Sequence, residues 1–386
     1  MMSPIPVTTR PIDGGRLVRW WAAGQGGAAH RCCWNTSTPS SYQNLVMSQD
    51  STIARADDLS KGSAGFTSFV ARVLEQLAVS AWLPAAMLTA VGALLVTMHR
   101  ESTSDVGAAV SIMSSASWTV FIVWAFGLVL ATMVTQAFSF GVIRALEGYW
   151  ASGWALDWAT RVRVRHHVRR SEVLHRRVVE LHRRLFESAR GRLLAEEERD
   201  HVDVWETDVY DIPPERQRVS DPATIAAALE IDWREKGDPA VAALFYRAAQ
   251  RVGDYPTAPH RILPTRMGNV LRASEERLGL EGDRLERFVM DNHLLVPSRL
   301  MGQHDQFRDR LEMYSLLVFV FFALACAAGP LLAGVRGHPV SAPITGVALL
   351  LALSMLSYRA AIASARGYGT ALVAMRDEIS AHQTPG

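Results

Sequence analysis

The sequence has little lysine, little cysteine and no familiar catalytic motif. Of its 40 basic residues only Lys61 and Lys236 are lysines, a skew that points to a GC-rich genome rather than to a function. Cys32, Cys33 and Cys326 lack the CxxC spacing of a zinc site and are too few for a disulfide framework. The chain contains no Walker loop, GxGxxG, HExxH or GxSxG. No linear motif therefore supports an enzyme, and we expect no cofactor and no metal.

An excess of charge of one sign is also missing. The 386 residues carry 40 basic and 38 acidic groups, so the formal net charge is +2. Bulk charge therefore gives no reason to expect nucleic-acid binding. With 49% hydrophobic residues, the chain is too apolar to be disordered throughout. These residues are concentrated in four blocks rather than spread as in a soluble core.

Each of the four blocks is long enough to cross a lipid bilayer. About 20 apolar residues in a helix cover a hydrocarbon core of roughly 30 Å. Buried helices of soluble proteins seldom stay uncharged on every face over that length. The sequence predicts an all-α membrane protein with two hairpins of spans, 77–143 and 313–358. The predicted spans are 77–98, 118–143, 313–335 and 339–358.

The positions of the basic residues near these spans predict the orientation. Positive residues gather on the cytoplasmic side of membrane proteins. One predicted side carries Arg100 and Arg336, whereas the other carries eleven basic residues. We therefore expect a bacterial plasma-membrane protein with both termini and residues 144–312 in the cytoplasm. The eleven are Lys61, Arg72, Arg144, Arg161, Arg163, Arg299, Arg308, Arg310, Arg359, Arg366 and Arg376.

The segments outside the spans divide into three parts. Residues 1–60 are rich in proline and glycine near their start and show no lasting periodicity, so we expect them to be disordered. A secretory signal is a weaker alternative, and translation from Met47 is another. Residues 144–312 form a helical cytoplasmic insert, and residues 359–386 form a cytoplasmic tail.

Charge is segregated along the insert. Its first part, up to Arg192, is rich in arginine, and we expect the stretch from Arg161 to Arg170 to meet anionic lipid headgroups. The histidines of this part are interpreted as solvated or facing lipid headgroups rather than metal-binding, because arginines flank each of them: His166, His167, His175 and His182. The acidic segment 196–215 is interpreted as a solvated linker, with folding back onto the arginine-rich helix as an alternative.

Helix signals run through the insert. An apolar stripe containing Leu174, Val178, Leu181 and Leu185 predicts a helix from about residue 171 to 198 that needs a partner, either in another subunit or within the insert. Proline after a capping residue and glycine at the end indicate further helices. These cover residues 222–236, 239–252, 265–278 and 283–295, and a last helix starts at Ser298 and continues into the third span.

Two short motifs are similar to a family of uncharacterised bacterial membrane proteins. The first is the run LPTRMGNVLRASEE from Leu263 to Glu276, preceded by Tyr255-Pro256, and the second is Glu147-Gly148-Tyr149-Trp150. The resemblance implies four spans around a cytoplasmic insert and no assigned activity. After Glu276 this chain departs from the family, since the expected tyrosine-glycine and tryptophan-proline pairs are absent.

Within these motifs we single out Glu147, Thr265, Arg266, Gly268 and Asn269 as candidate interaction or structural residues. Thr265 is suited to cap a helix, Gly268 allows a close backbone approach, and Arg266 with Asn269 offers hydrogen-bond donors. They fit either a pocket for an anionic ligand or a buried network that holds the insert against the membrane-proximal helices. The structural interpretation is preferred, because helix-starting Thr and Arg are mostly structural.

The leading functional prediction is a non-enzymatic scaffold or signalling module that acts through the insert, as a homo-oligomer and with an unidentified protein partner. The alternative is an oligomeric channel in which Thr132, Gln136 and Ser139 of the second span line the pore. A membrane-bound enzyme ranks third, since no catalytic motif supports it.

Overall fold

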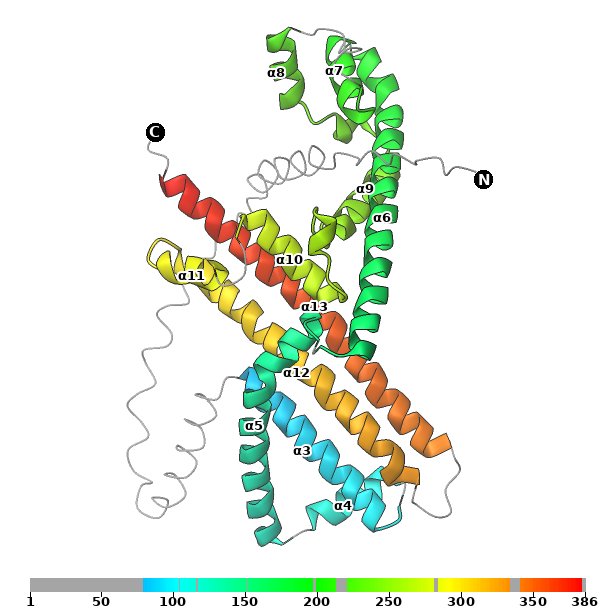
Figure 1. The fold of residues 1–386 in the computed structure, drawn as a ribbon, viewed down its shortest axis with the longest axis vertical. Helices are drawn as coiled ribbons and strands as arrows, with labels where there is room; N and C mark the ends of the chain where they lie inside the picture. The colour runs from blue at the N-terminus through cyan, green and yellow to red at the C-terminus, as the bar shows by residue number, and fades with distance from the viewer. Residues whose placement is uncertain are drawn as a thin grey trace, which may run out of the picture. The chain divides into compact units, whose positions relative to one another are not determined.

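The computed structural model describes residues 79–103, 105–115, 117–150, 152–196, 199–212, 221–280, 284–333 and 341–383 (Figure 1). These ranges contain α-helices and short 3-10 helices and no strand, which confirms the all-helical prediction for them. The chain divides into two units, Met1–Val79 and Ser80–Gly386, and the packing below belongs to the second. The predictions for residues 1–60 and for Met47 fall outside the described residues.

Four helices are long and apolar enough to cross a membrane, as expected for a multi-pass membrane protein. They are α3 (Val79–Arg100), α5 (Trp118–Glu147), α12 (Ser298–Ala333) and α13 (Ser341–Gln383). Each helix covers most or all of one predicted span. The short helix α4 (Val106–Ser114) follows α3, and the Asp105 carboxylate caps it by accepting a hydrogen bond from the Gly107 N–H at 2.8 Å.

The apolar halves of α12 and α13 pack along one another, as Figure 1 shows. Leu317, Val320 and Leu324 of α12 form a buried cluster with Leu350 of α13 and Leu95 of α3. The Ser354 hydroxyl adds a 2.9 Å hydrogen bond to the carbonyl of Val318. Such interhelical bonds contribute about 0.6 kcal/mol on average in a membrane.

Both of these helices extend beyond their predicted spans. α12 starts at Ser298 and enters the apolar run without a break, as the sequence predicts. α13 continues past residue 358 as one helix to Gln383, so the residues assigned to a separate tail prolong the fourth span. Gly369 allows this extension to approach α10 (Arg266–Leu278), because a Cβ there would lie 2.1 Å from the Ser274 hydroxyl.

The insert begins with α6 (Trp154–Ala195), a helix of 42 residues. Next come α7 (Arg199–Val209), α8 (Pro222–Glu230), η2 (Trp233–Lys236) and α9 (Pro239–Val252). The chain then passes through η3 (Pro259–Arg261), α10 (Arg266–Leu278) and α11 (Arg284–Asp291) to reach α12. Local signals explain several bounds: Asp238 caps α9, and Gly279 ends α10 in the left-handed conformation.

The apolar stripe of α6 finds its partner within the same chain. Leu181, Leu185 and Phe186 are buried against side chains of α7, α8, η2 and α9, including Trp233 and Phe245. Gly237 sits so close to Leu185 that an added Cβ would lie 2.4 Å from its Cδ1. The stripe is therefore accounted for without a second subunit.

Three sequence interpretations in this region need correction. The acidic segment contains α7, whose Val202, Trp205 and Val209 are buried in one cluster with α6, so part of it folds back onto the arginine-rich helix and is not a solvated linker. The helix expected over 222–236 breaks after Glu230, and the 3-10 helix η2 follows. His167 and His182 are 5% and 4% exposed, so they are buried rather than solvated, and His182 stacks on Phe245 with ring centroids 5.3 Å apart.

Candidate functional site

The end of α5 is shaped by the motif Glu147-Gly148-Tyr149-Trp150. Gly148 has φ of +103° and ends the helix, and its N–H and that of Tyr149 both donate to the Arg144 carbonyl. Glycine is needed here, because a side chain would be strained and would lie 2.6 Å from the Pro264 ring. Trp150 donates from Nε1 to the Ala145 carbonyl at 2.9 Å, so the turn is fixed from both sides.

The start of α10 lies directly against this turn. The Thr265 hydroxyl donates to the Glu147 carbonyl at 2.9 Å and accepts from the Gly268 N–H at 3.1 Å. A Cβ on Gly268 would lie 2.0 Å from the same Glu147 carbonyl oxygen. The two motifs singled out in the sequence, more than 100 residues apart, therefore meet in space and require a glycine at the contact.

Asn269 locks the loop that precedes α10. It is fully buried, and its side-chain amide donates to the carbonyls of Leu263 and Thr265 at 3.0 and 2.8 Å while its oxygen accepts from the Leu263 N–H at 2.7 Å. All the hydrogen bonds of this amide go to nearby backbone. Asn269 is thus a structural residue of the loop, with no group left to meet a ligand.

A buried carboxylate that the sequence analysis missed organises the opposite side of this region. Asp254 is 4% exposed and lies between two arginines of different helices. Its Oδ2 accepts from Arg266 of α10 at 3.1 Å, and its two oxygens accept from Arg366 of α13 at 2.7 Å each. Charge-assisted, bidentate pairs are the strong class of hydrogen bonds. No linear signal links Asp254 to Arg366, because each stands alone in its segment.

Tyr149 and Arg272 add a third contact between α5 and α10. The Arg144 guanidinium lies 4.7 Å from the centre of the Tyr149 ring, and the Tyr149 hydroxyl accepts a hydrogen bond from Arg272. Arg272 also pairs with Glu275 at 2.7 Å. This carboxylate and the Tyr149 hydroxyl raise the pKa of Arg272 despite its partial burial, so it stays charged.

Together these residues form what we call the junction: Glu147, Gly148, Tyr149, Asp254, Thr265, Arg266, Gly268, Asn269, Arg272 and Arg366. It brings together all five motif residues singled out in the sequence and adds Gly148, Tyr149, Asp254, Arg272 and Arg366. Hydrogen bonds and ion pairs join α5, α10, α13 and the loop before α10 at this place. These contacts join α10 and the loop before it to α5 and α13, two of the helices that are long and apolar enough to cross a membrane.

The polar residues of the second span do not share one environment. Thr132 and Thr135 are 6% exposed, and their hydroxyls donate to carbonyls of α5 itself, at 2.8 Å to Leu128 and 3.0 Å to Thr132. Gln136 is exposed and Ser139 is half-buried. The three candidate pore residues Thr132, Gln136 and Ser139 stand at steps of four and three on α5 but differ in exposure.

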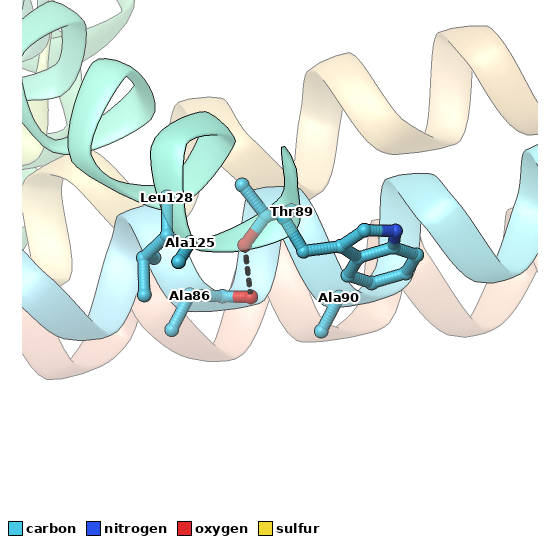
Figure 2. A pocket seen from close by; sticks show the side chains of 6 residues that line it. Ala86, Thr89, Ala90, Ala125 and Leu128 are labelled. Carbon is cyan, nitrogen blue, oxygen red and sulfur yellow. Dashed lines mark hydrogen bonds between the residues drawn. The ribbon is translucent and has the colours of Figure 1, made fainter. Parts of the chain in front are cut away.

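A small open groove lies between α3 and α5. It has a volume of about 260 Å³, and its lining is almost entirely apolar. Figure 2 shows Thr89 with its hydroxyl turned back to the Ala86 carbonyl, at 3.1 Å, so the one hydroxyl of the lining is already bonded. The remaining lining residues are Ala86, Ala90, Trp124, Ala125 and Leu128. In the parts of the chain that the structure covers, no group of three or more His, Cys, Asp or Glu is arranged to hold a metal ion.

Comparison of the chain with protein-family models, with curated proteins and with solved structures finds no match. The resemblance to a bacterial membrane-protein family therefore stays a prediction from two motifs.

Proposed function

We propose that this chain is a non-enzymatic scaffold or signalling module of a bacterial plasma membrane. In this proposal both termini and residues 144–312 lie in the cytoplasm, the chain assembles as a homo-oligomer, and the insert contacts a protein partner. The observation that carries the proposal is the junction. It fastens the insert to α5 through Glu147 and to α13 through Arg366, so a force or a partner on one part acts on the other.

Scaffolding is tested by a variant that loosens the junction and leaves the exposed surface unchanged. Asp254→Asn removes the charge that holds Arg266 and Arg366, whereas Asp291→Asn removes an exposed charge at the end of α11. Proximity labelling from the insert in cells should give a reproducible set of protein neighbours that Asp254→Asn changes and Asp291→Asn preserves. The same neighbours for all three proteins, or none above a free membrane marker, would contradict the proposal.

The channel is kept as a second candidate because Gln136 is an exposed amide on a span that contains no charged residue. Polar side chains facing lipid are costly and usually find a partner or a water-filled path. A channel requires a closed ring of four or more copies in nanodiscs and a conductance that Gln136→Leu alters. A native mass of one or two copies would exclude it, and the scaffold proposal is compatible with a dimer.

An enzyme ranks third. Ligand binding stabilises a folded protein, so a substrate or cofactor should raise the unfolding temperature of the full chain. A screen of common nucleotides, metals and lipids in which no compound stabilises the protein would count against it.

A further inference from the structure

The five arginines in the first half of α6 are all exposed and fall into two sets. Arg161, Arg165 and Arg169 make no hydrogen bond or ion pair with the loop before α10 in the described chain. Arg163 and Arg170 share a different stripe with His167, at steps of four and three residues. Arg163 donates to the Pro264 carbonyl at 3.3 Å, and His167 Nδ1 lies 3.1 Å from the Tyr255 hydroxyl. This second stripe therefore faces the loop before α10, and Arg266 is the first residue after that loop.

Positive charge at this place exceeds negative charge. Asp254 is shared by Arg266 and Arg366, and in the described ranges Arg163 and Arg170 have no carboxylate within ion-pair distance. The side chain of Asp254 is 5% exposed, whereas those of Arg266 and Arg366 are 40% and 36% exposed. A buried carboxylate thus fixes two guanidinium groups that still reach solvent, which is a preorganised arrangement for an anion.

His167 supplies a separate sign that a polar group is missing here. It is 5% exposed, and its Nε2 has no hydrogen-bond partner in the described parts of the chain. Burial first, and then the nearby Arg163, His166, Arg170 and Arg266, together lower the pKa of His167 to about 4. The imidazole is therefore neutral at pH 7, and its surroundings would be stabilised by a negative charge.

We propose that Arg163, Arg170 and Arg266 bind a single phosphate group beside His167. Arginine forks match the oxygens of a phosphate, and the charge excess supplies the attraction. α6 starts seven residues after the end of the apolar helix α5, so the site lies near the end of a predicted span. The phosphate belongs either to a phospholipid headgroup or to a soluble phosphate compound. This site goes beyond the proposed scaffold and needs no protein partner.

The first arm of the test measures lipid binding to the full chain. Native mass spectrometry from detergent would compare phosphatidylglycerol with diacylglycerol, which has the same tails and no phosphate. We expect one bound phosphatidylglycerol, at least about tenfold tighter than diacylglycerol. The second arm measures the thermal shift caused by inorganic phosphate. A response to the lipid alone assigns the site to a headgroup, and a saturable response to phosphate assigns it to a soluble compound.

The decisive comparison uses two double variants with equal loss of charge. Arg163→Gln with Arg170→Gln should weaken phosphate binding by about tenfold or more, whereas Arg161→Gln with Arg165→Gln should change it less than about threefold. Arg163→Lys with Arg170→Lys keeps the charge and should give intermediate binding, which also controls for folding. Equal losses in the two Gln variants would show general surface attraction and overturn the proposal. So would the absence of a response to both lipid and phosphate.

Discussion

At the scale of single residues, the junction depends on a few side chains that are buried and fully bonded. Asp254 links the segment after α9 to α10 and α13, and Asn269 fixes the loop that precedes α10. Asn269 was found from the sequence because it stands in a dense motif. Asp254 was not, because its meaning arises from Arg366, 112 residues away, and a single chain carries no sign of that pairing.

Asp254→Asn should destabilise the protein. Removing one member of a buried ion pair costs about 3–5 kcal/mol, and the partial exposure of the two arginines reduces this to about 2 kcal/mol. Thermal or denaturant unfolding of the full chain in nanodiscs measures the change. Asp291→Asn is the matched control and should stay within about 0.5 kcal/mol of the parent protein. Equal stability of the two variants would mean that the ion pairs of Asp254 with Arg266 and Arg366 do not stabilise the fold.

His182 should make stability depend on pH. Burial, and secondly Arg234, lowers its pKa from 6.5 to about 4, so the folded state resists protonation more than the unfolded state does. The free energy of unfolding is therefore unaffected by His182 above about pH 6.5. As the pH falls from 6.5 toward 4, it decreases by about 3 kcal/mol, because the unfolded state takes up a proton that the folded state does not. His167, with a pKa also lowered to about 4, acts in the same direction.

His182→Leu should reduce this loss of stability between pH 6.5 and 4 by about half, because His167 remains. The Nε2 atom of His182 has no hydrogen-bond partner in the described region, so the substitution should cost little stability at pH 7. His175→Leu is the control, since His175 on the same helix is only half-buried. Unfolding temperatures measured from pH 7 to 4 would refute this assignment if His182→Leu and the parent protein lost stability in parallel.

At the scale of helices, the sequence predicts the elements well where a local signal exists. α9 begins and ends where Asp238-Pro239 and Gly253 indicate, and α10 where Thr265 and Gly279 do. The sequence does not predict α7, because nine acidic groups in 196–215 obscure the spacing of Val202, Trp205 and Val209. A short apolar face is visible only once α6 supplies the surface that covers it.

Gly268→Ala should separate α10 from α5. The added Cβ would lie 2.0 Å from the Glu147 carbonyl oxygen, which is backbone and cannot turn aside. We expect a loss of about 3 kcal/mol, at the upper end of the cost of overpacking. Gly302→Ala in α12 meets no atom within 4 Å and should be neutral or stabilising by up to about 1 kcal/mol.

The same pair of variants tests the geometry directly. Cross-linking yields between the ends of α5 and α10 should fall for Gly268→Ala and stay constant for Gly302→Ala. If Gly268→Ala were as stable as Gly302→Ala and cross-linked equally well, the close approach of the two motifs would be wrong.

At the scale of the whole molecule, the sequence predicts four apolar helices because length and absence of charge are strong signals. It does not predict how the insert meets those helices. The apolar runs predict where the chain crosses a membrane. The ion pairs of Asp254 and the contact of Gly268 with Glu147 depend instead on residues that are distant in sequence and close in space. The orientation across the membrane and the 2+2 arrangement stay predictions of the positive-inside rule.

The central claim is that the insert and the membrane helices are held together as one unit at the junction. A double-mutant cycle on Asp254→Asn and Arg366→Gln, measured by unfolding of the full chain in nanodiscs, tests it most directly. Because the two side chains share two 2.7 Å hydrogen bonds, the double variant should lose little more stability than Asp254→Asn alone, with a coupling of about 1–3 kcal/mol. Losses that add within about 0.5 kcal/mol would show that the two residues do not interact and would contradict the account.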